Sequence, residues 1–242
     1  MTAAGCTDVG KVRNQNQDAI FISAEPIGPL PNLFILADGM GGHKAGDVAS
    51  ASAVACFCEN IRARAPEGEG FLDMLMDAAT AANRLVFEKS LADESFTGMG
   101  TTLTACVISG GKCEIVHIGD SRAYKIVNGS IIQVTNDHSY VNEMIKAKQI
   151  TPQEARKHPK RNVLTRVLGV GFEMEADGYV CETEPGGFIL LCSDGLTDML
   201  TDDVILETVS GNAPAEEKAR ALIARANGQG GLDNISVVLI EM

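Results

Sequence analysis

The sequence lacks the features by which a membrane protein or a nucleic-acid-binding protein is recognised. No stretch approaches the ~20 consecutive apolar residues of a membrane span, and residues 1–13 contain no apolar segment typical of a secretory signal. Basic residues are scarce, since 20 Lys and Arg stand against 32 Asp and Glu, for a net charge of −12. Binding to a phosphate backbone needs clustered basic side chains. We therefore expect no membrane span and no nucleic-acid partner.

The cysteines lack the number and the spacing of a disulfide framework or a zinc site. There are seven of them, no Cys-x-x-Cys occurs, and most lie within apolar stretches. Buried free thiols in a reducing compartment account for this pattern. We therefore expect a cytoplasmic protein.

The length and the composition are those of an ordinary folded protein. The chain has 242 residues, of which 45% are hydrophobic and 21% are charged. A chain of roughly 200 to 250 residues commonly forms one domain, and we expect a single domain over residues 1–242. The excess of acidic residues has two readings: it keeps the protein soluble, or it supplies the carboxylates of a cation site.

The most informative stretch is LFILADGMGG, at residues 33–42. Five apolar residues, Leu33 to Ala37, predict a buried strand. This strand ends at Asp38, and Gly39 begins a glycine-rich turn in which the backbone can come close to a ligand. A carboxylate and backbone carbonyl groups are therefore both available as ligands where the strand ends.

Three further aspartates stand at the ends of predicted strands. Asp120 and Asp194 follow apolar stretches, and Asp233 precedes one. If these strands share a core, the carboxylates converge and need cations to stay ionised. Oxygen ligands suit Mg²⁺ or Mn²⁺, and the wide spacing along the chain does not resemble a calcium-binding loop. Taken singly, Asp194 and Asp233 are more often turn or cap residues, and Asp120 could form a surface ion pair with Arg122.

The hydrophobic patterns group the strands together and the helices together, which indicates an α+β fold with a largely antiparallel sheet system. Residues 138–161 are polar and rich in Lys and Arg, and they read as an excursion from the core. Strands are predicted at 2–9, 18–24, 33–37, 102–109, 112–118, 122–127, 130–135, 177–182, 187–192 and 235–241, and helices at 44–65, 71–91, 202–209 and 215–226.

Eight motifs, in this order along the chain, resemble the metal-dependent protein phosphatase family, also called type 2C, in its compact prokaryotic form. They are RNQNQD (13–18), DGMGGH (38–43), GMGTT (98–102), HIGDSR (117–122), DHS (137–139), LTRVLG (164–169), CSDGL (192–196) and DN (233–234). The resemblance implies a central β-sandwich of two antiparallel sheets flanked by helical layers. It also implies a mobile flap, at about residues 138–165, beside the active site.

The resemblance implies a catalytic site with two Mn²⁺ or Mg²⁺ ions, and a third, weaker ion in prokaryotic members. The ions activate water for direct hydrolysis of a phosphate ester, without a covalent phosphoenzyme. The implied roles are a bridge between both ions for Asp38, a carbonyl ligand for Gly39, ligands of the second ion for Asp194 and Asp233, a ligand of the third ion for Asp120, support of the site for Asp18, and phosphate binding for Arg13.

The implied substrates are proteins phosphorylated on serine or threonine, and the implied partner is a bacterial serine/threonine kinase whose action the protein reverses. We expect a monomer. Two positions depart from the family pattern: Met40 replaces a histidine of many eukaryotic relatives, and Gln17 replaces a glutamate. The general acid is therefore unassigned, with His43 or solvent at the metal site as the alternatives.

Several residues in or near these motifs also have a purely structural interpretation. Arg13 could merely pair with a carboxylate, and His117 reads as a satisfied core histidine. Ser121 and Arg122 read as structural support. The basic residues of the flap either steer a phosphorylated peptide or simply face solvent. The protein could also be a non-catalytic family member, which should have lost metal ligands, or a nucleotide-binding protein, whose lysine-containing phosphate loop is missing here.

Overall fold

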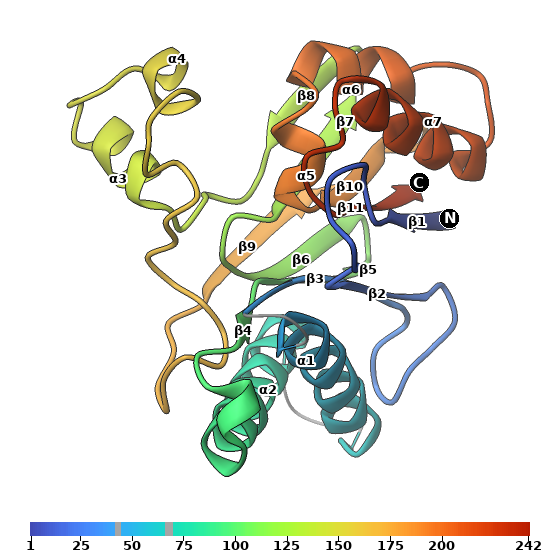
Figure 1. Cartoon of the computed structure of the whole chain (residues 1–242). Coiled ribbons are helices and arrows are strands. Elements are labelled where there is room, and N and C mark those ends of the chain that lie inside the picture. Colours follow the sequence, from blue (N-terminus) through green and yellow to red (C-terminus); the bar gives the residue numbers. More distant parts are fainter. Residues whose placement is uncertain (42–44, 66–69) are drawn as a thin grey trace.

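Two antiparallel sheets stack face to face in the computed structural model, which describes residues 1–41, 45–65 and 70–242 (Figure 1). The first sheet contains, in spatial order, β1 (Thr2–Asp8), β11 (Ile235–Glu241), β10 (Phe188–Cys192), β7 (Arg122–Val127) and β8 (Ser130–Gln133). The second contains β2 (Asp18–Ser23), β3 (Leu33–Met40), β5 (Leu103–Ser109), β6 (Lys112–Ile118) and β9 (Asp177–Glu182), with β4 (Gly100–Thr101) beside β3.

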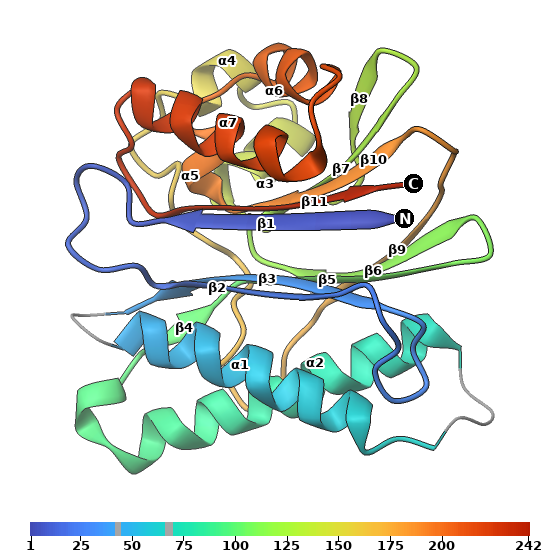
Figure 2. The same cartoon turned by 90° about the vertical axis from the view of Figure 1, so that its right-hand side faces the viewer.

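Helices cover the outer face of each sheet, so the order of layers is helix, sheet, sheet, helix (Figure 2). The second sheet is covered by α1 (Ala45–Arg62) and α2 (Phe71–Ala92), and the short η1 (Glu94–Phe96) follows α2. The first sheet is covered by α5 (Asp194–Thr197), α6 (Asp202–Val209) and α7 (Ala215–Gly228). This arrangement confirms the predicted α+β fold and the sandwich of antiparallel sheets flanked by helical layers.

Burial on both faces explains why the central strand β3 reads as a continuous apolar run. Leu33 and Ile35 pack against α1 and α2, the helices that cover the second sheet. Phe34 and Leu36 point the other way and pack between the two sheets, in a cluster that also contains Leu191 of the first sheet. Successive side chains of a strand point to opposite faces, so both faces must be apolar here.

The predicted excursion contains two short helices, α3 (Tyr140–Lys146) and α4 (Pro152–Ala155), which stand apart from the sandwich in Figure 1. Its two ends are tied together, because the Tyr140 N–H donates to the Val163 carbonyl and the Thr165 N–H donates to the His138 carbonyl, each at 2.8 Å. We call residues 138–165 the flap. Its assignment as a mobile segment, and the single-domain organisation, stay predictions.

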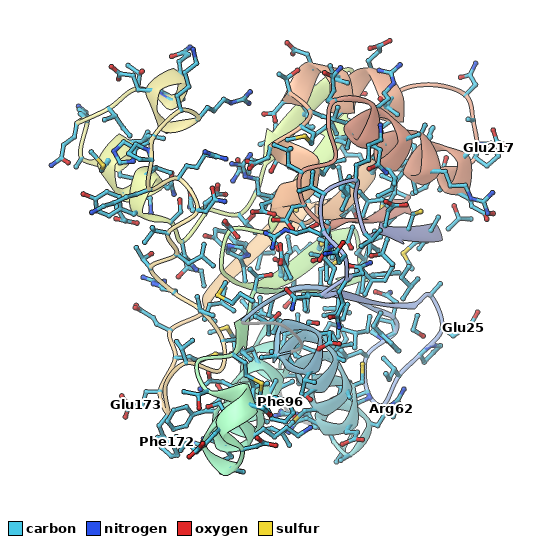
Figure 3. The ribbon with its side chains drawn as sticks, viewed as in Figure 1. Glu25, Arg62, Phe96, Phe172, Glu173 and Glu217 are labelled. Carbon is cyan, nitrogen blue, oxygen red and sulfur yellow. The ribbon has the colours of Figure 1, made fainter. Side chains whose placement is uncertain are left out.

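The chain returning from the flap runs down to α2 and carries Phe172 there (Figure 3), where the Arg84 guanidinium lies 5.5 Å from the centroid of the Phe172 ring. The Asn83 side chain of α2 holds this return segment, since it donates to the Gly171 carbonyl at 3.0 Å and accepts from the Gly169 N–H at 2.7 Å. The segment that follows the flap is therefore held against α2.

Most predicted elements are present, with small shifts at their ends. The strand that begins at Leu33 continues to Met40, past its predicted end, because its pairing with β2 extends to Asp38 and its last two residues pair with β4. The elements α5, η1 and β4 were not predicted. Lys44, the predicted start of the first helix, lies outside the described residues. Among the described residues, no helix is both long and apolar enough to cross a lipid bilayer.

Candidate active site

Asp18 and Asp38 lie directly opposite each other on the paired strands β2 and β3. The backbone of Asp38 is held on both sides by Thr102, whose hydroxyl accepts from the Asp38 N–H at 2.9 Å and whose N–H donates to the Asp38 carbonyl at 2.8 Å. The hydroxyl of Thr101 donates to the same carbonyl at 2.9 Å. These bonds fix the backbone of Asp38 and leave its carboxylate available.

Gly39, in β3, lies against the first turn of α1 and the residue that precedes β2. A Cβ at this position would lie 2.0 Å from the Gly46 carbonyl oxygen and 2.5 Å from the Gln17 carbonyl oxygen. No larger residue fits, which explains the glycine in the motif. His43, one alternative for proton transfer, lies outside the described residues.

Asp194 and Asp233 come together because α5 is pressed against the start of β11. A Cβ on Gly195 would lie 2.0 Å from the carbonyl oxygen of Asn234, so the two loops are in backbone contact. The Asn234 amide donates to the carbonyls of Val9 and Gln15, each at 2.9 Å. Asn234 therefore holds the loop that carries Arg13 against the loop that carries Asp233. Its place beside Asp233 in the DN motif was the available signal for this role.

Asp120 follows β6 and is placed by its two neighbours. Gly119 has a φ of +108° and packs against Thr102, and the Ser121 hydroxyl lies 2.8 Å from the Thr102 hydroxyl. Arg122 pairs with Asp137 through a forked contact of 2.9 Å and 2.6 Å. The predicted alternative, a surface ion pair of Asp120 with Arg122, is not the contact that this arginine makes. The expectation that Ser121 and Arg122 give structural support to the site stays a prediction.

The aspartates interact strongly with one another. Burial raises the pKa of Asp38 well above its ordinary value, and the charges of Asp18, Asp194, Asp120 and Asp233 raise it further. Burial likewise raises the pKa of Asp194, followed by the charges of Asp120 and Asp233. The structure therefore brings all five predicted carboxylates into one electrostatic cluster, although they come from distant parts of the chain.

The pKa values of Asp18 and Asp120 are raised as well, and individual neighbours contribute to each shift. Burial raises the pKa of Asp18 to about 6, against hydrogen bonds from Ser236 and Ser193 that lower it. The Ser193 hydroxyl donates to Asp18 Oδ2 at 2.9 Å, a link that sequence reasoning missed although Ser193 stands in the CSDGL motif. Burial and the nearby charge of Asp137 raise the pKa of Asp120 to about 7.

The donor set fits a hard divalent cation. Asp18 Oδ1 and Asp194 Oδ1 are buried without a hydrogen-bond partner, and an isolated buried carboxylate oxygen is costly unless a cation compensates it. Carboxylate and carbonyl oxygens are the ligands that Mg²⁺ and Mn²⁺ prefer. Among the residues described, no three Asp, Glu, His or Cys side chains already enclose a single point as metal ligands. Backbone carbonyls, water or a turn of one side chain would therefore complete the shell.

Both carboxylate oxygens of Asp233 are engaged in hydrogen bonds, one of them with Arg13. Its guanidinium donates to Asp233 Oδ2 at 2.7 Å, while Asp233 Oδ1 accepts from the Asn234 N–H at 2.8 Å. The simple reading of Arg13, pairing with a carboxylate, matches this contact. Since 52% of the Arg13 side chain is exposed, it also stays within reach of a ligand from solvent.

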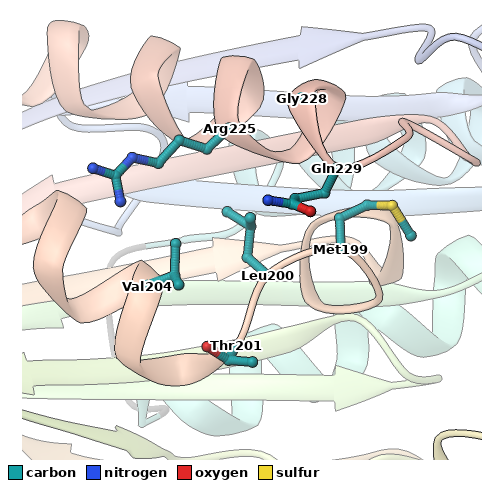
Figure 4. A pocket seen from close by; sticks show the side chains of 7 residues that line it. All are labelled: Met199, Leu200, Thr201, Val204, Arg225, Gly228 and Gln229. Carbon is teal, nitrogen blue, oxygen red and sulfur yellow. The ribbon is translucent and has the colours of Figure 1, made fainter.

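Two cavities among the described residues are of similar size, and only the first of them is lined by carboxylates of this cluster. One of about 410 Å³ lies between the flap and the carboxylates, with Asp120 and Asp194 on one side and Arg156 and Arg161 among the residues of the flap. The other, of about 600 Å³, is shown in Figure 4 and is lined by Met199, Leu200, Thr201, Val204, Arg225, Gly228 and Gln229. None of these seven residues is acidic, so the smaller cavity is the candidate for cation chemistry.

Comparison with known proteins identifies the family of this chain. A family model described as protein phosphatase 2C matches residues 11–227. The protein phosphatase PhpP of Streptococcus pneumoniae is 38% identical over 246 residues, which covers 98% of this chain and 95% of that protein. The serine/threonine phosphatase stp of Listeria monocytogenes is 36% identical and covers 97% of this chain and 93% of its own.

Solved structures of such phosphatases superpose over the whole fold. The serine/threonine phosphatase of S. agalactiae has a TM-score of 0.92 at 36% identity, covering 100% of this chain and 99% of that one. The catalytic domain of PstP, in complex with two manganese ions, has a TM-score of 0.86 at 36% identity, covering 98% and 96%. The chain therefore belongs to the protein phosphatase 2C family, and it is an enzyme of the serine/threonine protein phosphatase class.

Proposed function

We propose that this protein hydrolyses phosphoserine and phosphothreonine in other proteins, with a centre of two Mn²⁺ or Mg²⁺ ions and a weaker third. The observation that carries the proposal is the cluster of five aspartates with two buried, unpartnered oxygens, Asp18 Oδ1 and Asp194 Oδ1. The manganese ions in the PstP structure, a relative at 36% identity, support the same kind of centre.

The ions would be held by Asp38, the Gly39 carbonyl, Asp194 and Asp233, with Asp120 at the third. When bound, such cations lower the pKa of water and neutralise the charge on phosphoryl oxygens. The chain itself supplies the geometry. Thr102 fixes the backbone of Asp38, and the other supports are those described above.

Asp18 and Arg13 have different parts in the proposed reaction. Asp18 supports the site through Ser193, which bonds it directly and stands next to Asp194. Arg13 is the proposed phosphate-binding residue, because its exposed, planar guanidinium can donate to two phosphate oxygens at once. Asp233 would hold the arginine in place until a substrate arrives.

We further propose that the protein acts in the cytoplasm as a monomer and reverses the action of a serine/threonine kinase. All seven cysteines are free in the structure, which supports a reducing compartment. The kinase and the phosphorylated proteins are proposed from the class of the relatives, whose names include serine/threonine phosphatases.

The direct test is hydrolysis of a phosphothreonine peptide in the presence of Mn²⁺. We expect activity that disappears in excess chelator and a loss of about a thousandfold in kcat/KM for Asp38→Asn, because several kcal/mol of transition-state stabilisation depend on the metal site. Asp203→Asn, at an exposed position of α6, is the matched control and should keep full activity. Full activity in chelator, or in Asp38→Asn, would contradict the proposed mechanism.

A further inference from the structure

A second cluster of titratable side chains lies next to Asp120 and has no part in the proposed chemistry. It stands at the neck of the flap, by which we mean the paired ends of the flap at residues 138–140 and 163–165. Its centre is His138, the first residue of the flap, which is only 3% exposed. His138 bonds Gly119 twice: its N–H donates to the Gly119 carbonyl at 2.7 Å, and its Nδ1 accepts from the Gly119 N–H at 3.1 Å. Gly119 directly precedes Asp120, so His138 holds the peptide that leads into a proposed metal ligand.

The other side of the same imidazole faces Asp177, the first residue of β9. Because Nδ1 accepts a hydrogen bond, the ring proton belongs on Nε2, which lies 3.2 Å from Asp177 Oδ2. Asp177 Oδ1 also accepts from Arg166 at 2.8 Å, and Arg166 directly follows the flap. One carboxylate of the second sheet therefore holds residues at both ends of the flap.

Further side chains contact Asp177 and His138. Tyr179, two residues along β9, donates to Asp177 Oδ2 at 3.0 Å. The ring of His117 lies with its centroid 5.0 Å from that of His138, and its Nδ1 lies 2.9 Å from the Thr104 hydroxyl. His117 is fully buried, as the sequence reading expected of a core histidine, although its Nε2 has no hydrogen-bond partner. The imidazole of His138 thus packs against the ring of His117 and forms hydrogen bonds with Gly119 and Asp177.

We propose that His138 is a positioning residue that couples the flap to Asp120. The proposal rests on the proposed phosphatase function for its meaning, but the coupling itself is a property of the fold. A movement at the flap neck shifts His138 or breaks its bond to Asp177, and the shift reaches Asp120 through the two bonds to Gly119. Substrate contacts on the flap and the orientation of Asp120 are linked in this way.

Two amide substitutions separate the two halves of this link. In His138→Asn the amide oxygen can replace Nδ1 as acceptor for Gly119, but the side chain is too short to reach Asp177. In His138→Gln the longer side chain can reach Asp177 but places no acceptor at the position of Nδ1. A merely structural role predicts that both variants lose stability and keep the kinetics of the folded protein.

The kinetic test compares a phosphothreonine peptide with p-nitrophenyl phosphate, which is too small to engage the flap. For His138→Gln we expect kcat to fall about tenfold for both substrates and half-maximal activation to need more Mn²⁺, since one hydrogen bond to the Asp120 loop is lost. For His138→Asn we expect a KM several-fold higher for the peptide, with little change for the small ester. Glu207→Gln, which breaks the surface pair with Arg225, is the control and should change neither kcat nor KM for either substrate.

Hydrogen exchange supplies a readout that does not depend on activity. In the metal-free protein, His138→Gln should speed exchange of the Gly119 amide, and His138→Asn should speed exchange in residues 138–166. If both variants keep wild-type exchange in these segments and wild-type kinetics with both substrates, the coupling is refuted. If the wild-type protein hydrolyses neither substrate, the proposed function is refuted, and the exchange experiment still decides the coupling.

Discussion

At the scale of single residues, the proposed metal site is a concentration of negative charge that lowers the stability of the folded protein. Asp18 and Asp38 face each other on neighbouring strands, and both have a raised pKa. A raised pKa means that the folded chain binds protons more tightly than the unfolded chain, so ionisation of these groups opposes folding. A bound cation removes this cost, which is why the effect should be measured without metal.

We therefore predict that the protein in chelator becomes more stable as the pH falls from about 8.5 to about 6.5. In this window the pKa of Asp120, raised to about 7, makes the folded state take up protons that the unfolded state does not. Thermal unfolding followed by circular dichroism should show a rising Tm. At the lower end of this window and below it His117 opposes the trend, because its pKa is lowered from 6.5 to about 4 and the unfolded state protonates first.

The control for this prediction is Asp120→Asn, which should raise the Tm at pH 8.5 and flatten the rise in the absence of metal. A Tm that falls between pH 8.5 and 6.5 in chelator would show that the carboxylates do not repel one another in the folded protein. With saturating Mn²⁺ we expect the wild-type protein to gain stability from the bound ion.

At the scale of elements, the site depends on backbone contacts that only glycine allows. Gly195 in α5 lies against the carbonyl of Asn234, and this contact sets the distance between the loops that carry Asp194 and Asp233. A methyl group at this position has no flexible neighbour to displace. The geometry of two proposed ligands is therefore tied to one helix–strand contact.

For Gly195→Ala we predict a loss of about 1–3 kcal/mol in the free energy of unfolding, because the added Cβ would meet backbone at 2.0 Å. Activation by Mn²⁺ should weaken as well. Gly228→Ala is the matched control, since nothing lies within 4 Å of a Cβ at this end of α7. Urea denaturation measures both variants, and equal stability of the two would disprove the contact.

Part of the fold and of the candidate site could be predicted from the sequence, and part could not. The strand β3 was predictable because both of its faces are buried. Asp38, Asp120, Asp194 and Asp233 were predictable as candidates because each stands at the end of an apolar run, whereas Asp18 was named only from the family resemblance. The helix α5 was not, since its four residues are too few to show a period. Asn234 and Ser193 act by joining segments more than 170 residues apart in the chain, and no spacing in the sequence reveals such a link.

The same limit applies to Arg13 and to the flap. Arg13 pairs with a residue 220 positions away, so only the structure could show which of its readings describes the present contact. The flap was predictable as polar and outside the core. Its anchoring through His138 and Asp177 was not, because neither residue carries a local pattern that names its partner.

At the scale of the whole molecule, three apolar layers alternate with the two sheets. The helices α1 and α2 cover one cluster, α5 to α7 cover another, and the third lies between the sheets. Each sheet contributes to the middle layer, so neither half can unfold without exposing apolar surface of the other. This sharing supports the proposal of a single domain.

We predict one cooperative unfolding transition for the metal-free protein, with the same midpoint by circular dichroism and by fluorescence of the three tyrosines. Leu191→Ala, in the middle layer, should lower the free energy of unfolding by about 2–5 kcal/mol and keep the single transition. Leu91→Ala is the control, because this leucine is 72% exposed and should cost less than about 0.5 kcal/mol. Two separate transitions would show that the halves fold independently.

The pairing of β1 with β11 has a practical consequence for anyone who handles this protein. Thr2 is paired with Glu241, whereas Asp233 lies just before the other end of β11. A strand of seven residues is about 23 Å long, so a purification tag or a fluorescent label attached at either terminus starts roughly that far from the carboxylates. Such attachments should leave access to the catalytic end open, and the adjacent termini offer a place to immobilise the enzyme on a surface with that end facing outward.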